Sequence, residues 1–381
     1  MQCDYVDAGR CHSCTLMGVP YADQLADLQR AVASILGTHV EEGAWLPPIA
    51  SPESGFRNKA KLAVGGTTAA PTFGILDGDL RGVDLRRCGL YEPGLHDAVL
   101  RLAEAVPEIG LQPYDAAARQ GELKHLLVTA SPAGELMVRV VLRSTNQLGR
   151  VRRSLPLLQE RLPGLRVLSV NLQPAHAAVL EGDEEVVLTD ADTLPMPVAD
   201  VVLHLGTRSF FQTSTPMADA LYRQAGDWIQ AAAPRRMWDL YCGVGGFALH
   251  AAHRARAASR ELDVLGIEVS PEAIRSARRS AAELGLGAAR FVDGDARSLA
   301  AHEDSRPDLV VVNPPRRGIG ADLARQLDAG PAGTVVYSSC NPVTLARDLD
   351  AMPGMRVTAA RTVDMFPQTR HAEVLVLLTR R

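Results

Sequence analysis

The stretch RMWDLYCGVGGFALHAAH, residues 236–253, decides the fold of the C-terminal half of this chain. A short apolar run predicts a buried strand that carries Asp239 at its end, and a helical pattern begins after the last glycine. Between them, Gly243, Gly245 and Gly246 let the backbone approach a ligand closely. The stretch therefore predicts a ligand-binding turn at the end of a strand.

The alternation of strands and helices continues beyond this stretch. Apolar strand patterns, each followed by a helix-like segment, lie at 261–270, 289–296, 307–318 and 333–342. Such alternation is typical of a mainly parallel, doubly wound sheet. In these sheets ligands bind at the carboxyl ends of the strands, where the polar residues of this half also fall. We therefore predict a Rossmann-like α/β domain over residues 205–381.

The preceding part of the chain, residues 1–204, has a different pattern. Apolar and β-branched residues alternate there as in strands, two of which are joined by a Pro-Ala-Gly turn at 132–134. A helical pattern at 146–164 ends at a Pro-Gly pair. These features predict a separate α+β domain with an antiparallel sheet. Its clearest strand patterns are 122–131, 134–144, 165–174 and 185–190.

The composition indicates a soluble globular protein. The chain has 381 residues, of which 46% are hydrophobic and 22% charged, and its formal net charge is −4. It shows no secretory leader and no apolar run long enough to span a bilayer, so we expect a cytoplasmic protein, and a monomer. Basic residues cluster locally, for example at 57–61 and 150–153, which is enough for a protein that reads one structured RNA.

Further acidic residues follow the next two strands. Glu268 ends the strand after the glycine turn, where a carboxylate binds the ribose hydroxyls of an adenosine ligand. Asp295, after the third strand, is a candidate contact near the adenine. The glycine spacing differs from the G-x-G-x-x-G of NAD-binding folds, and Asp239 precedes the glycines. The pattern Asp-x-x-x-Gly-x-Gly-Gly resembles the first motif of class I S-adenosylmethionine methyltransferases, which favours that cofactor, with NAD as the alternative.

A cysteine stands where the fifth strand ends, in VYSSCNP, residues 336–342. The helix start that follows offers N–H groups and a dipole that favour a thiolate at Cys340. A thiolate that adds to C6 of uracil makes C5 nucleophilic enough to take a methyl group. The Asn313-Pro-Pro sequence also occurs in enzymes that methylate exocyclic amino groups, but these usually continue with an aromatic residue, and Arg316 stands here. We therefore favour methylation of uracil C5.

The last apolar strand pattern begins with an acid, Glu373, in VDMFPQTRHAEVLVLL, residues 363–378. A carboxylate there is costly unless it has a role or a partner. It can take the C5 proton as a general base, and the alternatives are a cap or a salt bridge to Arg370. The target base must lie in a loop or be flipped out of its stack. Candidate stacking partners, of which at least two are better explained as core residues, are Phe210, Phe211 and Phe366.

Four of the six cysteines lie in the first part of the chain. Cys3, Cys11 and Cys14 form a C-x7-C-x2-C run, and Cys88 follows much later. Four soft ligands suit an iron–sulfur cluster or zinc, and the spacing leaves both open. Isolated surface thiols are the remaining alternative.

Five motifs occur in one order: SFFQT (209–213), DLYCGVGGF (239–247), NPPRRG (313–318), SCNP (339–342) and DMFPQTRHAE (364–373). Together they resemble the RNA uracil-5-methyltransferase family. The resemblance extends over the whole chain, because the N-terminal cysteines, GFRNKAK and GELK look like the branch that makes 5-methyluridine in large-subunit ribosomal RNA. Many relatives have Asp where this chain has Asn313.

The resemblance implies a class I methyltransferase that carries a methyl group from S-adenosylmethionine to a specific uridine of 23S ribosomal RNA, through a covalent adduct between cysteine and C6. It implies a 4Fe-4S cluster at the four cysteines and no TRAM domain. The alternatives are the same chemistry on transfer RNA, methylation of an amino group or small molecule, and a non-catalytic RNA-binding protein. The roles implied are nucleophile for Cys340, base for Glu373, and cofactor contacts for Gln212, Tyr241, Glu268 and Asn313.

Overall fold

The computed structural model describes residues 1–177, 179–296 and 306–381. They form two compact units, one made of Met1–His12 with Ser54–Met196 and the other of Ser13–Glu53 with Pro197–Arg381. The predicted boundary after residue 204 lies close to the division between Met196 and Pro197. The segment 13–53, which the sequence assigns to the N-terminal domain, packs instead with the C-terminal unit.

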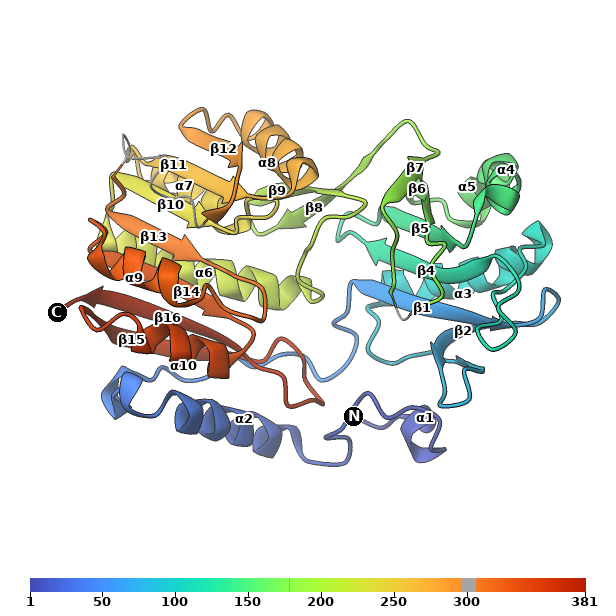
Figure 1. Cartoon of the computed structure of the whole chain (residues 1–381), viewed down its shortest axis with the longest axis horizontal. Coiled ribbons are helices and arrows are strands. Elements are labelled where there is room, and N and C mark those ends of the chain that lie inside the picture. Colours follow the sequence, from blue (N-terminus) through green and yellow to red (C-terminus); the bar gives the residue numbers. More distant parts are fainter. Residues whose placement is uncertain (178, 297–305) are drawn as a thin grey trace. The chain divides into compact units, whose positions relative to one another are not determined.

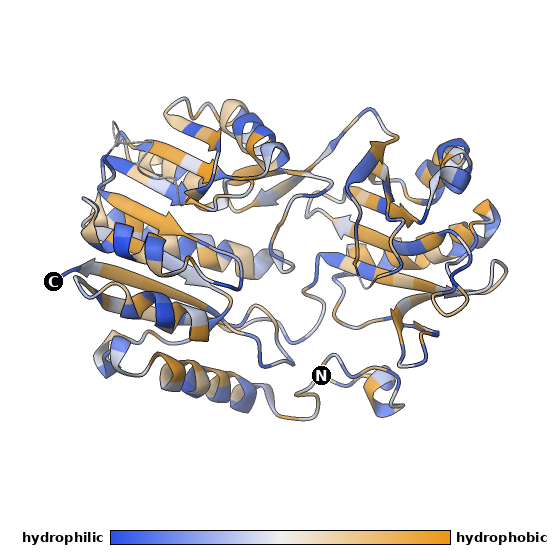
Figure 2. Cartoon of the chain, in the orientation of Figure 1, coloured by the Kyte–Doolittle hydropathy of each residue, from blue (hydrophilic) through white to orange (hydrophobic). Residues whose placement is uncertain are grey.

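The C-terminal unit is built on a seven-stranded sheet (Figure 1). In spatial order its strands are β12 (Ala289–Asp293), β11 (Asp263–Glu268), β10 (Arg236–Leu240), β13 (Leu309–Val312), β14 (Thr334–Ser339), β16 (Glu373–Arg380) and β15 (Met355–Val363). Neighbours from β12 to β14 pair in parallel, and β16 runs antiparallel to β14 and β15. The predicted Rossmann-like sheet is confirmed. All four residues of β13 are buried, as in a strand covered on both faces, and Figure 2 shows it as strongly apolar.

The helices of this unit are α6 (Thr215–Ala232), α7 (Gly246–Ala257), α8 (Pro271–Glu283), α9 (Ala321–Ala329) and α10 (Pro342–Asp350). Local sequence sets two of the starts: the side chains of Ser270 and Asn341 cap α8 and α10, and a proline follows each. The helix-like segment predicted after β12 lies largely outside the described residues. None of the helices in the described ranges combines the length and apolar character needed to cross a bilayer.

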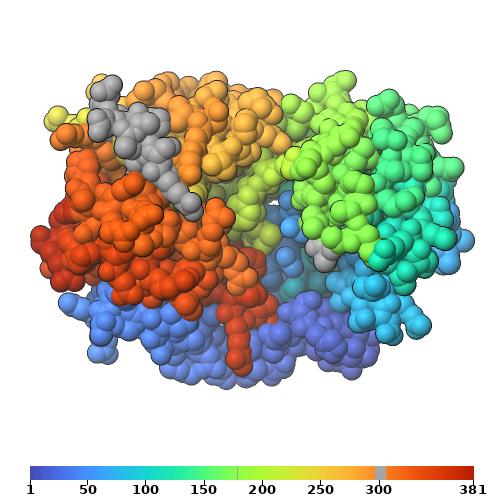
Figure 3. Space-filling model, viewed as in Figure 1, coloured from blue at the N-terminus to red at the C-terminus, as the bar shows by residue number. Residues whose placement is uncertain are grey.

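The segment 13–53 covers the edge of this sheet at β15. It contains α2 (Tyr21–Leu36) and the 3-10 turns η1 (Gly37–His39) and η2 (Glu42–Ala44). The amides of Leu46 and Ile49 donate to the carbonyls of Ala360 and Thr362, each at 2.8 Å, so the chain extends the sheet beyond β15. In Figure 3 the blue surface of this segment borders the orange and red surface of the C-terminal strands and helices.

The same segment also fixes the chain that leads into β16. Tyr21 donates a hydrogen bond to Asp364 at 2.8 Å, and the buried amides of Gln24 and Gln368 pair at 2.9 Å. Gln368 has φ 68° and its main-chain oxygen accepts from the amide of Leu16 at 3.0 Å. These contacts hold a strained loop directly before Glu373.

The N-terminal unit has its own seven-stranded sheet. Its strands in spatial order are β3 (Gly82–Asp84), β2 (Pro71–Leu76), β1 (Lys59–Gly66), β4 (Leu123–Ala130), β5 (Leu136–Leu142), β6 (Leu165–Leu172) and β7 (Glu184–Val187). Its helices are α1 (Asp4–Asp7), α3 (Pro93–Ile109), α4 (Leu148–Arg153) and α5 (Leu155–Arg161), with the 3-10 turn η3 (Thr145–Gln147). A separate two-stranded sheet pairs β8 (Thr193–Val198) with β9 (Val201–Gly206).

Two predictions for this unit are wrong in detail. The sheet is mixed, because β5 and β6 pair in parallel while the other neighbours are antiparallel. The chain crosses from β5 to β6 through helices, and such a crossover is the connection that parallel pairing needs. The helix predicted at 146–164 is divided at Ser154, since Pro156 has no N–H to continue the first helix and begins a second one instead.

Candidate active site

The glycine turn predicted from the sequence begins where β10 ends. Tyr241, Gly243 and Gly245 have φ of 61°, 54° and 84°. The chain therefore turns sharply out of the strand and into α7. A left-handed conformation is costly at a bulky residue such as Tyr241, and strain of this kind concentrates at functional sites.

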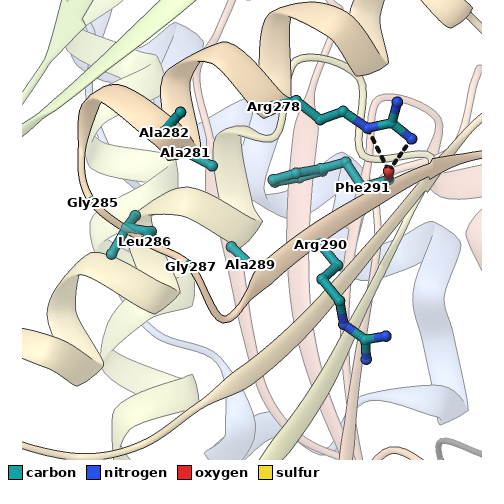
Figure 4. Close-up of a pocket in the computed structure, with 9 residues that line it drawn as sticks. All are labelled: Arg278, Ala281, Ala282, Gly285, Leu286, Gly287, Ala289, Arg290 and Phe291. Atoms are coloured by element: carbon teal, nitrogen blue, oxygen red, sulfur yellow. Dashed lines mark hydrogen bonds between the residues drawn. The ribbon is translucent and has the colours of Figure 1, made fainter.

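Packing explains two of the glycines around this turn. A Cβ on Gly245 would lie 2.9 Å from the ring of Phe291 on β12, and one on Gly266 would clash with the same ring. Arg278 on α8 donates two hydrogen bonds to the Phe291 carbonyl, with N···O distances of 2.9 and 2.6 Å (Figure 4). The surface cavity in that figure, about 550 Å³, opens at the amino end of β12. This cavity is therefore different from the predicted ligand site, which lies at the carboxyl ends of the strands.

Two carboxylates lie against the turn. Asp239 is fully buried; its Oδ2 accepts from the Ala248 amide at 2.9 Å, while Oδ1 has no hydrogen-bond partner among the described residues. Burial raises the pKa of Asp239 to about 7, and the charge of Glu268 adds to the rise. Glu268 accepts from the amides of Gly243 at 3.3 Å and Ser270 at 3.0 Å. Its carboxylate is thereby fixed between the loops that follow β10 and β11.

The other predicted cofactor residues follow neighbouring strands. Tyr241, Asp295 and Asn313 come after β10, β12 and β13, so with Glu268 they share the carboxyl edge of the sheet. Gln212 is buried in the segment between β9 and α6. Their contacts with S-adenosylmethionine stay a prediction.

Cys340 lies between the end of β14 and the start of α10, and its side chain is partly exposed. Asn341 caps the helix and also donates to the carbonyl of Arg316 at 3.0 Å. The hydroxyl of Thr344 donates to the same oxygen at 3.1 Å. The helix start thus holds the NPPRRG loop next to a cysteine that is not sealed in the core.

The charges around Cys340 oppose one another. Partial burial raises the pKa of the thiol and the carboxylate of Glu373 raises it further, whereas Arg316 and the cysteine's own backbone N–H lower it. The net direction is upward. The backbone N–H at the helix start therefore acts in the expected direction, but in the protein alone desolvation and the nearby carboxylate outweigh it.

Glu373 and Cys340 lie at the ends of the neighbouring strands β16 and β14. The paired part of β14 and β16 ends with Ser339 opposite Val374, so Cys340 follows the last paired residue of β14 and Glu373 precedes that of β16. The carboxylate of Glu373 is close enough to act on the pKa of the Cys340 thiol. The carboxyl is 2% exposed, and Ser338 donates a hydrogen bond to its Oε1. The partner that the structure shows is thus Ser338 and not Arg370. Burial raises the pKa of Glu373 to about 7, against the lowering effect of Ser338.

This pairing links the two groups electrostatically. When Glu373 is protonated, the negative charge that disfavours the Cys340 thiolate disappears. When Glu373 is ionised, it is able to accept a proton. A carboxyl with a pKa of about 7 changes readily between these states near neutral pH. The pair is therefore suited to a nucleophile and a base that act in turn.

Comparisons with known proteins identify the family of this chain. A family model described as tRNA (Uracil-5-)-methyltransferase matches residues 186–381. The 23S rRNA (uracil(747)-C(5))-methyltransferase RlmC of Halothiobacillus neapolitanus is 47% identical over 390 residues and covers 100% of both chains. That of Edwardsiella ictaluri is 45% identical over 381 residues, with 100% of this chain and 99% of the relative covered. The chain belongs to the RNA uracil-5-methyltransferase family.

A solved structure shows how far the family fold extends in this chain. The Pyrococcus abyssi tRNA (uracil-54, C5)-methyltransferase, in complex with S-adenosyl-L-homocysteine, aligns with a TM-score of 0.79 and 25% identity, over 96% of this chain and 85% of that one. The likeness thus includes both units and not the Rossmann-like unit alone.

The N-terminal cysteines of this uracil-5-methyltransferase family member fall in both units. Cys3, Cys11 and Cys88 lie in the N-terminal unit, and Cys14 falls in the other. Burial raises the pKa of the Cys88 thiol, and the nearby thiols of Cys3 and Cys11 add to the rise. In the part of the chain that the structure describes, no group of three or more His, Cys, Asp or Glu is arranged to hold a metal ion. A cluster at these cysteines stays a prediction.

The three candidate stacking residues differ in exposure. Phe210 is 71% exposed, Phe211 is buried, and Phe366 is half-buried with its ring edge-on to His371. Phe211 is therefore a core residue. Phe210 is the most exposed of the three, and a base can reach it without rearrangement of the core.

Two residues near the site have no role in the sequence reasoning. Ser338 contacts Glu373, and its position two residues before Cys340 is the signal that was available, since alternate residues of a strand share one face. Tyr222 on α6 packs its hydroxyl against Gly246, and the charges of Asp239 and Glu373 add to the burial that raises its pKa. Nothing in its helical sequence context indicated that position.

Proposed function

We propose that this protein transfers a methyl group from S-adenosylmethionine to C5 of a uridine in 23S ribosomal RNA, at the site equivalent to uracil 747 in the names of its relatives. The observation that carries the proposal is that Cys340 follows β14 and Glu373 begins its neighbour β16, close enough for the carboxylate to act on the pKa of the thiol. Identity of 47% over the full length to an enzyme named for 23S rRNA supports that substrate over transfer RNA.

Each group has one step in the proposed reaction. Cys340 adds its thiolate to C6, and the electrons of the C5=C6 bond make C5 nucleophilic. S-Adenosylmethionine, when bound, would supply an electrophilic methyl group to C5, with its S–CH3 bond broken and S-adenosylhomocysteine as the leaving group. Glu373 then removes the C5 proton, the C5=C6 bond forms again, and the S–C6 bond breaks to return the thiolate.

The carboxyl edge fits this cofactor. The Glu268 carboxylate is fixed by two amides, which supports the proposal that it accepts hydrogen bonds from the ribose hydroxyls. The buried Asp239 has an oxygen without a partner among the described residues, and a cationic ligand at the turn would stabilise its charge. Cofactor contacts are further proposed for Gln212, Tyr241, Gly243, Gly245, Asp295 and Asn313.

The target uridine must leave its stack for C6 to reach the Cys340 sulfur. We propose that the exposed ring of Phe210 stacks on a base. Basic residues of the N-terminal unit, such as Arg57 and Lys61, are proposed to contact the RNA backbone.

Deletion of the gene tests the substrate. We expect mass mapping to show that 23S ribosomal RNA loses one 5-methyluridine, which a plasmid-borne copy restores, while transfer RNA from the same cells keeps its own. Loss in transfer RNA alone would establish the alternative substrate. If neither RNA changes, the enzyme assignment fails and a binding role is left.

A metal site is proposed separately for Cys3, Cys11, Cys14 and Cys88. Three of these thiols lie in one unit, where two affect the pKa of the third, and Cys14 follows Cys11 closely in the chain. Four thiolates suit a 4Fe-4S cluster, which would crosslink the N-terminus to the Cys88 loop. Nothing in the methyl transfer above needs an electron carrier, so the proposed role is structural.

We expect Cys88→Ser to remove the brown colour and bound iron of the anaerobically purified protein, and to lower its melting temperature by several degrees. Cys242→Ser is the matched control, since Cys242 lies by the glycine turn, far from the N-terminal run in sequence. Zinc in place of iron, or iron that survives Cys88→Ser, would contradict the cluster assignment.

A further inference from the structure

The hydroxyl of Ser338 is the hydrogen-bond partner that Glu373 has within the described residues. Ser338 lies on β14, is fully buried, and donates to Oε1 of the Glu373 carboxylate. A buried carboxylate keeps its charge only where hydrogen bonds replace water. The state in which Glu373 is able to accept a proton thus depends on this serine.

Among the described residues, no hydrogen bond to the Glu373 carboxylate comes from the other elements around it. From β14 the titratable neighbour is the Cys340 thiol, and from α6 it is the Tyr222 phenol. On β15 the paired residue is the apolar Val363. Neither titratable neighbour carries positive charge, so Ser338 is the polar group that favours the ionised carboxylate.

We propose that Ser338 is a positioning residue for the base: its hydroxyl holds Oε1 of Glu373, so that Oε2 is the oxygen that takes the C5 proton. In that step the C5–H bond breaks, the proton goes to Oε2, the electron pair forms C5=C6, and the S–C6 bond breaks to free the Cys340 thiolate. This inference rests on the proposed role of Glu373 as the base.

Removal of the hydroxyl affects this step more than the earlier ones. In Ser338→Ala the carboxylate is buried without a donor, so a smaller fraction is ionised at neutral pH and its oxygens are no longer oriented. A hydrogen bond to a charged group is worth enough to slow proton removal by about tenfold to a hundredfold. Addition of Cys340 and methyl transfer do not use Oε2, and a protonated Glu373 opposes the thiolate less, so neither step should become slower.

Two labels separate the steps. Single-turnover reactions use RNA with tritium at C5 of uridine and S-adenosylmethionine with a carbon-14 methyl group. In the unaltered protein, tritium release should keep pace with methyl transfer. In Ser338→Ala it should lag at least about tenfold, while an enzyme–RNA adduct accumulates on denaturing gels.

The pH profile of tritium release provides a second readout. Ser338 lowers the pKa of Glu373, so its loss raises that pKa and should move the midpoint of release to higher pH. Overall turnover would not report on Glu373 alone. The pKa of Asp239 is also about 7, so its titration would change turnover over the same pH range. Ser338→Thr keeps the hydroxyl and should restore both the rate and the midpoint.

Ser280→Ala is the matched control, because it removes another fully buried serine hydroxyl. Ser280 lies on α8, and its hydroxyl accepts a hydrogen bond from the His204 amide at 2.9 Å. This variant should show no lag. The inference is overturned if Ser338→Ala slows methyl transfer and tritium release equally, or if tritium release does not lag at all, provided that Glu373→Gln still traps the adduct. If Glu373→Gln traps nothing, the base assignment itself fails.

Discussion

Replacement of Cys340 by alanine should lower methyl transfer to 23S RNA by at least about a thousandfold. Without sulfur addition at C6, C5 of uracil is too weak a nucleophile to take the methyl group. Binding of S-adenosylmethionine should persist, because the cysteine is outside the proposed cofactor contacts. Incorporation of labelled methyl groups measures the first effect, and calorimetry the second.

A substrate that traps the covalent adduct gives a yes-or-no test of the same role for Cys340. RNA with 5-fluorouridine at the target has no C5 proton to lose, so it should form an adduct that survives denaturation with the unaltered protein and none with Cys340→Ala. Cys242→Ala is the matched control: burial raises the pKa of the Cys242 thiol well above its usual value, so it is a poor nucleophile and its removal should leave the adduct intact. An adduct in Cys340→Ala would place the nucleophile elsewhere.

Replacement of Glu373 by glutamine should have an effect of a different kind. The variant should transfer one methyl group and then remain bonded to the RNA, because no base removes the C5 proton. We expect multiple turnover to fall by about a hundredfold to ten-thousandfold, with a stable complex on ordinary uridine RNA. The shape of the side chain is kept, and its carbonyl still accepts from Ser338, so the fold should be unaffected.

The double variant Cys340→Ala with Glu373→Gln controls for tight non-covalent binding. It should show no denaturation-resistant complex, since the bond to C6 needs the sulfur. If Glu373→Gln alone turns over at the normal rate and accumulates no complex, another group is the base and the proposed mechanism fails at that step.

Local sequence was enough for the Rossmann-like unit. The alternation of apolar strands and helices, the glycine turn at 243–246, and the proline-marked starts of α8 and α10 are features of short stretches that fold alike in many proteins. The carboxyl-edge rule then placed Glu268, Asn313 and Cys340 on one side of the sheet before any contact was known.

Errors arose where distant parts of the chain meet. The segment 13–53 was assigned to the wrong unit because its ties to β15 and to the loop before Glu373 join residues more than three hundred positions apart. The β5–β6 pair was taken as antiparallel because alternating apolar residues do not encode strand direction.

The sequence by itself determined the parallel sheet, the glycine turn and the identities of the candidate nucleophile and base, because each depends on residue type and local pattern. Only the tertiary structure decided that Ser338 binds Glu373, that Tyr222 lies near both carboxylates, and that the pKa of Cys340 is raised. These features depend on burial and on charges brought close by strand pairing, and a linear sequence does not specify such distances.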